Sequence, residues 1–185
     1  MQINELTDEK LVKKIREENI DFYGLIIERY QQKLSHYLRK FTNDPDERED
    51  ILQIVFIKVY RNLDSFNIKK KFSSWIYRVA HNQGIDFLKK HANQEISLES
   101  VEYKVIDENI DLSRDFDKSI LEEKIRTAFN EIKLKYREPL VLFFFEEKSY
   151  EEISDILRIP QNTVGTLISR GKKEIKNILE QKLIR

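Results

Sequence analysis

Cysteine is absent from this sequence, and glycine and proline are scarce. Its 185 residues include no cysteine, only four glycines and only three prolines. Without cysteine this chain has no disulfide, no thiolate metal ligand and no thiol redox switch, which fits a reducing cytoplasmic compartment. Few glycines and prolines, set among many leucine, isoleucine, lysine and glutamate residues, indicate an all-α protein.

Long apolar runs and motifs for catalysis are also missing. The longest apolar run, residues 139–145, is too short to cross a bilayer, and the N-terminus has no basic region followed by an apolar one. His36, His81 and His91 lie far apart without cysteine companions, which disfavours a metal site. No glycine-rich phosphate loop, nucleophile elbow or HExxH motif is present. We therefore expect no membrane insertion, no cofactor and no enzymatic activity.

Charge is balanced overall but not along the chain. The 33 lysines and arginines equal the 33 aspartates and glutamates, so the formal net charge is zero. Basic residues dominate between Lys58 and His91 and again after Gly165, whereas residues 95–117 between these segments are acidic. Both basic segments remain compatible with nucleic-acid binding, because a local cluster of charge matters more than the sum.

Hydrophobic periodicity divides the chain into two helical parts. In the first part, four stretches have apolar residues at spacings of three and four: residues 8–18, 22–41, 50–63 and 75–88. Thr7 is the expected N-cap of the first helix, and Ser73 or Ser74 that of the fourth. The periodicity is lost over residues 93–119 and returns at residue 120. We predict two small all-α domains, residues 1–92 and 120–185, joined by a flexible acidic linker over residues 93–119.

The stretch Asp50–Leu63 is apolar on two sides when it is placed on a helix at about 100° per residue. One stripe contains Ile51, Ile54, Val55 and Val59, and the other contains Leu52, Phe56, Tyr60 and Leu63. Either this helix is buried at the centre of a bundle, or one stripe faces the domain's own core and the other faces a protein partner. The DNA-binding patterns farther along the chain favour the second alternative, with the first stripe in the core.

Near the C-terminus the pattern is typical of a helix-turn-helix. Ser149 and Glu152 form a capping-box sequence, residues 158–160 make a turn, and a final helix runs to about Leu183. The apolar stripe of that helix is Val164, Ile168, Gly171, Ile175 and Ile178. Its opposite face carries side chains suited to a major groove: Asn162, Thr166, Ser169 and Lys173, flanked by Arg170 and Lys172. The alternative is an ordinary helical hairpin with a solvated polar face.

A second candidate nucleic-acid site lies between Phe66 and Lys90. Basic residues alternate here with aromatic ones, a combination suited to single-stranded nucleic acid, whose bases stack on aromatic rings. The alternative is a core helix whose lysines only keep the surface soluble. Trp75 falls in the apolar stripe and is assigned to the core. Lys69–Lys71 and Phe72 remain candidates for DNA contact, because they are expected to lie in a loop.

These segments together resemble extracytoplasmic-function (group 4) bacterial sigma factors, over nearly the whole length of the chain. EDILQIVFIKVYRNLDSF resembles the region 2 helix of that family, usually of the form (D/E)DLxQ(E/D)xFxxxW. KFSSWIYRVAHNQGIDFLKK is similar to the part of region 2 that melts the promoter and reads its -10 element. YREPLVLFFFEEKSYEEISDILRIPQNTVGTLISRGKK is similar to region 4, the helix-turn-helix that binds the -35 element.

The resemblance implies a non-catalytic, cytoplasmic subunit that binds core RNA polymerase and directs promoter-specific initiation. For a coiled coil of the largest polymerase subunit, the matching residues are Asp50, Gln53, Phe56 and Tyr60. For the -10 element, duplex and then single-stranded, they are Lys69, Lys70, Lys71, Phe72, Ser73, Tyr77, Arg78, Asn82, Lys89 and Lys90. For the -35 duplex they are Gln161, Asn162, Thr163, Thr166, Ser169, Arg170, Lys172 and Lys173. The flap of the second-largest subunit and an anti-sigma protein are the other partners that the resemblance implies.

The recognition helix departs from the family's TV(K/R)SR pattern. Gly165 and Leu167 stand where basic residues are common. Each lost phosphate contact lowers the salt slope of binding by about 0.9. We therefore expect -35 binding that is weaker and less salt-dependent, and that relies on Arg170, Lys172 and Lys173.

Two other functions remain compatible with these patterns. One is a stand-alone helix-turn-helix regulator that binds duplex DNA without polymerase. The Phe56–Tyr60 stripe and the Lys69–Phe72 loop disfavour it, since such a regulator needs neither. The other is a sigma-like interaction protein that has lost promoter use, and the thinned recognition helix keeps this alternative open.

Overall fold

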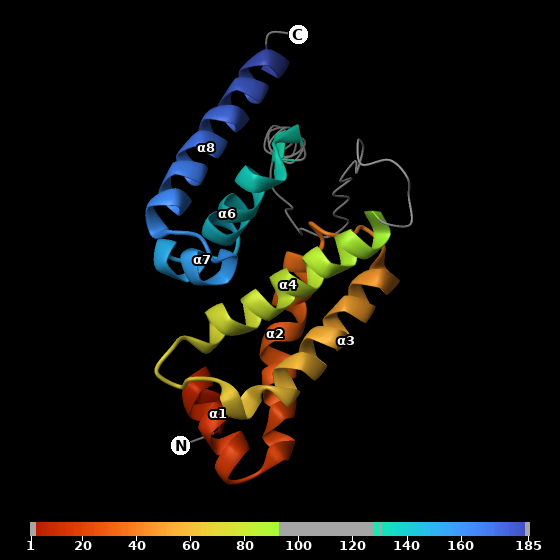
Figure 1. The fold of residues 1–185 in the computed structure, drawn as a ribbon, viewed down its shortest axis with the longest axis vertical. Helices are drawn as coiled ribbons and strands as arrows, with labels where there is room; N and C mark the ends of the chain where they lie inside the picture. Colours follow the sequence, from red (N-terminus) through yellow and green to blue (C-terminus); the bar gives the residue numbers. More distant parts are fainter. Residues whose placement is uncertain (1–2, 93–127, 130, 184–185) are drawn as a thin grey trace, which may run out of the picture. The chain divides into compact units, whose positions relative to one another are not determined.

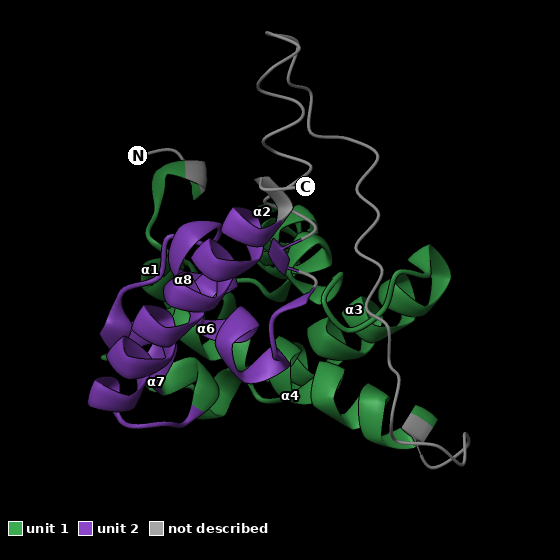
Figure 2. Ribbon diagram, turned by 90° about the horizontal axis from the view of Figure 1, so that it is seen from above, with its two compact units in different colours: residues 1–101, 155–157 green, residues 102–154, 158–185 purple. Residues whose placement is uncertain are grey.

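The computed structural model describes residues 3–92, 128–129 and 131–183, and every regular element in these ranges is a helix. The predicted all-α class is therefore confirmed. Within the same ranges, no helix is both long enough and apolar enough to span a membrane. The helices form two compact units, which Figure 2 shows in different colours: residues 1–101 with 155–157, and residues 102–154 with 158–185. The predicted linker, residues 93–119, lies outside the described residues, so the division at residues 92 and 120 stays a prediction.

The first unit contains the four predicted helices, which Figure 1 traces from red to green. They are α1 (Asp8–Glu17), α2 (Tyr23–Leu38), α3 (Pro45–Arg61) and α4 (Phe72–Ala92), with short 3₁₀ turns at Ile3–Glu5, Ile20–Phe22 and Leu63–Ser65. The Thr7 side chain caps α1 by accepting a hydrogen bond from the Lys10 backbone, as the sequence predicts. Asp44 caps α3 in the same way, ahead of a proline at the first helical position.

The start of α4 differs from the prediction that Ser73 or Ser74 caps it. The helix begins at Phe72, whose backbone N–H donates to the Glu9 carboxylate of α1 over 2.9 Å. A carboxylate at a helix N-terminus is favourable because the helix dipole is positive there. Ser74 is instead buried, with 6% of its surface exposed. This cap comes from a residue that lies 63 positions away in sequence, so no local pattern could indicate it.

Helix α1 also holds the segment that precedes α4. The Arg16 guanidinium donates to the backbone carbonyls of Leu63 and Phe66, 2.6 Å from the latter. Arg16 and Glu9 therefore attach both ends of the segment between α3 and α4 to the same helix. Two more contacts join α1 to α2, because Asp8 accepts from Arg29 over 2.8 Å and from the Tyr30 hydroxyl over 2.5 Å. Burial and the Asp8 carboxylate raise the pKa of Tyr30 above its ordinary value.

The core of the first unit is aliphatic between α1, α2 and α3 and aromatic toward α4. Its fully buried side chains include Leu11, Ile26, Leu34, Leu38, Val55, Val59, Phe72, Ile76 and Tyr77. Gly84 of α4 lies directly against Phe41, since a Cβ placed on Gly84 would come within 2.3 Å of the Phe41 ring. The glycine therefore allows α4 to approach the end of α2 more closely than any other residue would permit.

The second unit contains α6 (Leu134–Phe144), α8 (Gln161–Leu183) and all but the last three residues of α7 (Tyr150–Leu157). The predicted capping box is confirmed: Ser149 accepts from the Glu152 backbone over 3.2 Å, and Glu152 accepts from the Ser149 backbone over 2.9 Å. Gly171 of α8 packs on α6, where a Cβ would lie 2.6 Å from Leu140. Val164 and Ile168, on the predicted apolar stripe of α8, are also buried.

Candidate functional site

The first candidate surface is the solvent-facing side of α3. At about 100° per residue, the buried side chains of α3 fall on one continuous arc: Ile51, Leu52, Val55, Phe56 and Val59. The opposite arc is exposed and holds three large apolar side chains, Ile54 at 40% exposure, Ile57 at 50% and Tyr60 at 47%. Asp50 and Gln53 are exposed on the same arc. Three large apolar side chains on one outer helix face are characteristic of a protein-binding surface.

Two sequence predictions for α3 need correction. Ile54, which the sequence assigned to the core, is exposed. Phe56, which the sequence assigned to a partner, is buried in its own unit, with 8% of its surface exposed. The boundary between buried and exposed residues does not follow the two stripes inferred from sequence, because residues of both stripes are buried in the core. Ile57 was not singled out from the sequence, although it is apolar and lies between Gln53 and Ile54 on the helix surface. Asp50, Gln53 and Tyr60 do lie on the exposed arc, and their partner contacts stay a prediction.

Tyr60 is supported from beneath by α2. Its ring packs edge-on against Tyr23, with the ring centroids 5.2 Å apart. The Tyr23 hydroxyl in turn donates to the Phe56 backbone carbonyl over 2.7 Å. Burial raises the pKa of Tyr23 above its ordinary value, because the charged phenolate would lose its hydration there. The exposed face of α3 is therefore fixed to α2 rather than free to rotate.

The second candidate surface begins with the basic loop that precedes α4. Lys69, Lys70 and Lys71 are all exposed there, as is Ile68 at 44%. Asn67 shapes the loop, since its side chain accepts from the Lys69 backbone over 3.0 Å and its carbonyl accepts from the Lys70 backbone over 2.9 Å. An asparagine turn of this kind fixes the backbone locally. It directs a row of cations outward next to an α4 N-terminus that Arg16 and Glu9 hold in place.

The two aromatic residues predicted to contact DNA in this region are buried. Phe72 has no exposed surface, and its ring lies within 5.7 Å of the rings of Tyr30, Phe66 and Trp75. Tyr77 is 1% exposed and packs against Tyr37, with the ring centroids 5.1 Å apart. Both predictions are corrected, because these side chains form the core between α2 and α4. Trp75, assigned to the core, is only partly buried, at the edge of the same cluster.

The remaining predicted residues of α4 are more accessible. Arg78, Asn82 and Lys89 recur at spacings of four and seven, so they share one side of the helix with Trp75. Lys90 is exposed but lies about 100° away from Lys89 around the helix. Ser73 is partly buried in the first turn. The structure therefore groups the loop lysines and one polar face of α4, and it leaves Lys90 outside this group.

The third candidate surface is the helix-turn-helix of α7 and α8. Arg158 ends α7 in a left-handed conformation, with φ 55° and ψ 44°. The Ser154 hydroxyl then donates to the Ile159 carbonyl over 2.6 Å, and Pro160 accepts from the Thr163 backbone over 2.8 Å as α8 begins. These contacts fix the short turn that sets the two helices at an angle. The predicted turn over residues 158–160 is confirmed.

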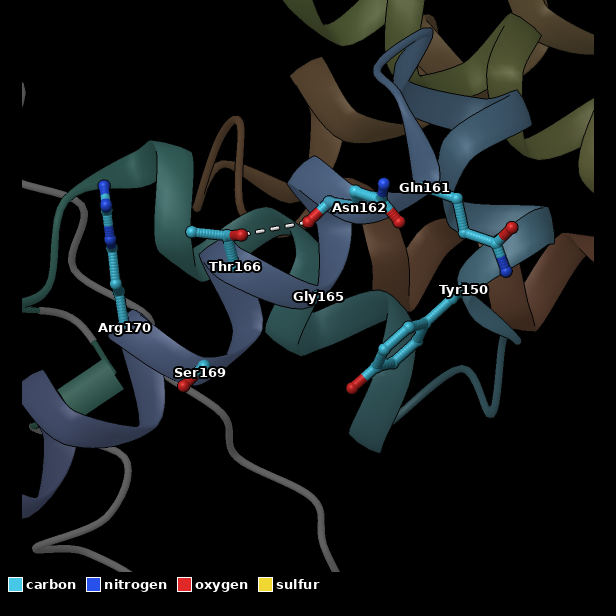
Figure 3. A pocket seen from close by; sticks show the side chains of 7 residues that line it. All are labelled: Tyr150, Gln161, Asn162, Gly165, Thr166, Ser169 and Arg170. Carbon is cyan, nitrogen blue, oxygen red and sulfur yellow. Dashed lines mark hydrogen bonds between the residues drawn. The ribbon is translucent and has the colours of Figure 1, made fainter.

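The outer face of α8 holds the residues predicted to bind duplex DNA. Gln161, Asn162, Thr163, Thr166, Ser169, Arg170 and Lys173 are all exposed. Most of them surround a shallow depression, shown in Figure 3, that is lined by Tyr150, Gln161, Asn162, Gly165, Thr166, Ser169 and Arg170. The Thr166 hydroxyl donates to the Asn162 carbonyl over 2.9 Å. Tyr150, the first residue of α7, was not identified from the sequence, because its place in the capping box conceals its nearness to α8.

Lys172 occupies a different position from the rest of this set. Its ammonium group lies 5.5 Å from the ring centroid of Phe143 and 5.0 Å from that of Phe144, both in α6. A cation held over two aromatic rings is stabilised there. Lys172 is therefore directed toward α6, and Arg170 and Lys173 are the predicted cations that remain on the outer face. Among the described residues, no group of acidic, histidine or cysteine side chains could hold a metal ion.

The fold and these surfaces define a helical DNA-binding protein with a helix-turn-helix in a separate unit. Comparisons with known proteins agree. Residues 26–94 match the family model for Sigma-70 region 2, and residues 122–175 match that for Sigma-70 region 4. The chain is 30% identical to the ECF RNA polymerase sigma factor SigW of Bacillus subtilis, over 95% of this chain and 98% of that protein. It is 29% identical to the ECF RNA polymerase sigma-E factor of Haemophilus influenzae, over 95% and 97% of the two chains.

Solved structures share the fold over most of the chain. CnrH, in complex with the cytosolic domain of CnrY, has a TM-score of 0.69 at 18% identity, covering 94% of this chain and 97% of CnrH. The sigma factor RpoE of Bartonella quintana, in complex with the anti-sigma factor NepR, has a TM-score of 0.69 at 19% identity, over 85% and 96%. The chain belongs to the extracytoplasmic-function sigma factors of the sigma-70 family, which direct promoter-specific initiation of transcription. Sigma factors are initiation factors rather than catalysts.

Proposed function

We propose that this sigma factor binds core RNA polymerase through the exposed face of α3. The observation that supports the proposal is the row of Ile54, Ile57 and Tyr60 on the outer arc of that helix, all at least 40% exposed. Exposed apolar side chains rimmed by polar ones, here Asp50 and Gln53, fit a partner helix better than they fit water. The family resemblance assigns this helix to a coiled coil in the largest polymerase subunit. We propose that the exposed face of α3 makes that contact, and that Ile57 rather than the buried Phe56 contributes to it.

The basic loop and the polar face of α4 form the proposed -10 site. Lys69–Lys71 would neutralise phosphates, and Arg78, Asn82 and Lys89 would follow the strand along α4. Because Phe72 and Tyr77 are buried, stacking of an extruded base on those rings is not available. Capture of such a base would rely on the loop and on the exposed edge of Trp75. The cost of unstacking, a few kcal/mol per base, is lowest where the duplex is already opened by polymerase.

The outer face of α8 is the proposed -35 site. Its polar residues reach base edges and Arg170 and Lys173 reach phosphates, in the manner of a recognition helix in a major groove. With few cations on this face, contact of the same unit with the flap of the second-largest subunit would supply much of its affinity for the promoter. The linker, residues 93–119, would connect the two DNA sites.

Regulation by an anti-sigma protein is part of this proposal. Of the solved structures with the same fold, RpoE is in complex with the anti-sigma factor NepR, and CnrH is in complex with the cytosolic domain of CnrY. A partner of this kind would act most simply by covering the α3 face and so competing with polymerase. We further propose that the protein works in the cytoplasm, where its polymerase and promoter DNA are found.

Run-off transcription tests the proposed function as a whole. Purified chain added to core RNA polymerase should give transcripts that start at defined promoters in a genomic DNA library, and core polymerase alone should not. A stand-alone regulator would bind duplex DNA without polymerase and give no such transcripts. A chain that binds core polymerase but starts no transcript from any DNA would instead be a sigma-like interaction protein.

One substitution tests the role of the missing cations. Replacing Gly165 by lysine should tighten binding of the holoenzyme to a -35 duplex at low salt and make the salt slope steeper by about 0.9, because one phosphate contact is added. The structure accommodates the change, since a Cβ at this position lies 3.4 Å from the Tyr150 ring, an ordinary contact distance. A gel shift over a series of salt concentrations measures both effects. Unchanged affinity and slope would mean that residue 165 does not face the phosphates.

A further inference from the structure

Helix α1 holds the segment between α3 and α4 at three backbone positions. The Arg16 guanidinium donates to the carbonyl of Leu63 and, over 2.6 Å, to that of Phe66. The Glu9 carboxylate accepts from the Phe72 N–H over 2.9 Å. Figure 1 shows this segment, in yellow, passing beside α1. The anchors therefore lie on both sides of the three exposed lysines of the basic loop.

Buried side chains hold the same two ends of the loop. Phe66 and Phe72 are 5% and 0% exposed, and their ring centroids are 5.4 Å apart. Both rings lie beside Trp75, with centroid distances of 5.0 Å and 5.5 Å. Between the two phenylalanines, residues 67–71 are all exposed. The position of the lysines therefore depends on where α1 and the aromatic cluster hold the ends of the loop.

The charge of Glu9 is unfavourable for DNA binding at this place. Its carboxylate contacts the backbone of the residue that follows Lys71, at the edge of a surface where lysines would meet phosphates. A carboxylate near a phosphate repels it, so electrostatics alone would make Glu9→Ala and Glu9→Gln bind DNA equally more tightly. A positional role predicts a difference between them, because glutamine keeps an oxygen that can accept from the Phe72 N–H and alanine does not.

We propose that Glu9 and Arg16 are positioning residues for promoter recognition: from α1 they fix the loop lysines and Trp75 relative to the opened -10 strand, and so contribute to its sequence selectivity. This inference rests on the proposed function of the loop and of α4 in -10 binding. Phosphate contacts carry no sequence information themselves but set the register in which bases are read. A loop whose ends shift would still attract DNA by its charge, but it would read the bases less selectively.

A ratio of two affinities measures this role. Holoenzyme of the full chain with core RNA polymerase first selects sequences from a promoter library that is opened as a bubble and randomised over the -10 region. Affinity is then compared between the selected bubble and the same bubble with its -10 bases in scrambled order. We expect Glu9→Ala to lower this ratio about fivefold or more, the discrimination that one base contact supplies. Affinity for the scrambled bubble should stay the same or rise, and Glu9→Gln should keep the ratio.

Arginine-to-lysine variants supply a matched control. Lysine keeps the charge but lacks the planar fork with which Arg16 reaches two carbonyls at once. Arg29 of α2 is comparable, since its side chain is 24% exposed against 20% for Arg16, and it donates to the Leu6 carbonyl over 2.9 Å. We expect Arg16→Lys to lower the ratio by a similar factor and Arg29→Lys to leave it unchanged. Because each ratio is measured on one protein preparation, a loss of folded protein in a variant does not change it.

The outcomes separate this inference from the function on which it rests. If a -10 sequence is selected but Glu9→Ala or Arg16→Lys keeps the ratio, the positioning role of that residue is wrong while the -10 function stands. Loss of the ratio in Glu9→Gln or Arg29→Lys as well would assign the effect to charge or to the general packing of α1, and would also overturn the inference. A holoenzyme that selects no -10 sequence would overturn the proposed -10 function and the inference together.

Discussion

Replacing Ile57 by glutamate should abolish capture of core RNA polymerase while leaving the first unit folded. Ile57 is 50% exposed and lies between Gln53 and Ile54 on the outer face of α3. A central apolar residue of a protein interface commonly contributes about 2 kcal/mol or more, which corresponds to about a 30-fold loss of affinity. A buried carboxylate would add to that loss. The stability of the free protein should change by about 1 kcal/mol at most, since the site is exposed and only the helix dipole disfavours the new charge.

A matched control makes this prediction specific. Ile68 is 44% exposed in the basic loop, away from α3, so Ile68→Glu adds the same charge to a similarly exposed isoleucine. Surface plasmon resonance or size-exclusion chromatography with core polymerase, in the absence of DNA, should show normal binding for Ile68→Glu and none for Ile57→Glu. Equal binding by both variants would place the polymerase contact elsewhere.

The structure also changes how Phe56 is interpreted in such an experiment. The Phe56 ring is buried in the core, and truncating a buried phenylalanine to alanine costs about 3–5 kcal/mol. A Gln53→Ala, Phe56→Ala double variant would therefore lose polymerase binding through unfolding. Gln53→Ala alone, or together with Ile57→Glu, is the informative change.

Two glycine-to-alanine substitutions should have opposite effects on stability. Gly84→Ala places a methyl 2.3 Å from the Phe41 ring, and Phe41 is 2% exposed between the rings of Tyr37 and His81. With no room for the ring to move, we expect a net loss of about 2–3 kcal/mol in the free energy of unfolding, despite the better helix propensity of alanine. Gly165→Ala meets Tyr150 at an ordinary distance and should gain about 0.5–1 kcal/mol.

Urea unfolding measures both effects. The chain has one tryptophan, Trp75, which lies in the first unit and reports on Gly84→Ala by fluorescence. Gly165 lies in the second unit, and its variant is followed by far-UV circular dichroism, which detects all helices. A Gly84→Ala protein as stable as the natural one would mean that α4 and α2 separate without cost at this point.

Local patterns were sufficient for the helices and for the helix-turn-helix. The Thr7 cap, the Ser149–Glu152 capping box and the turn at residues 158–160 are interactions between near neighbours in sequence, so residue types and spacing alone predict them. The face of α8 is equally clear, because Val164 and Ile168 of its apolar stripe are buried, Gly171 packs on α6, and the polar residues opposite are exposed. The candidate -35 residues followed from that pattern, apart from Tyr150 and the orientation of Lys172.

The α3 helix shows why the same reasoning failed elsewhere. A helical wheel gives the angle of each side chain around its own axis, but it does not give the width of the arc that neighbouring helices cover. In this unit α2 and α4 cover α3 over a wide arc that includes both Val55 and Phe56 and excludes Ile54 and Ile57. Phe72 and Tyr77 follow the same rule, because their burial depends on rings contributed by α2.

The all-α class, the order of the helices and the family could be predicted from local patterns, since these depend on periodicity, capping and motif spacing within short segments. The apolar residues that remain available to a partner, and the residue that caps α4, could be identified only from the folded chain. These depend on contacts between segments far apart in the chain, such as Glu9 with Phe72 and Gly84 with Phe41. The shallow depression lined by Tyr150 and Gly165 belongs to the same group, because its lining residues come from both α7 and α8.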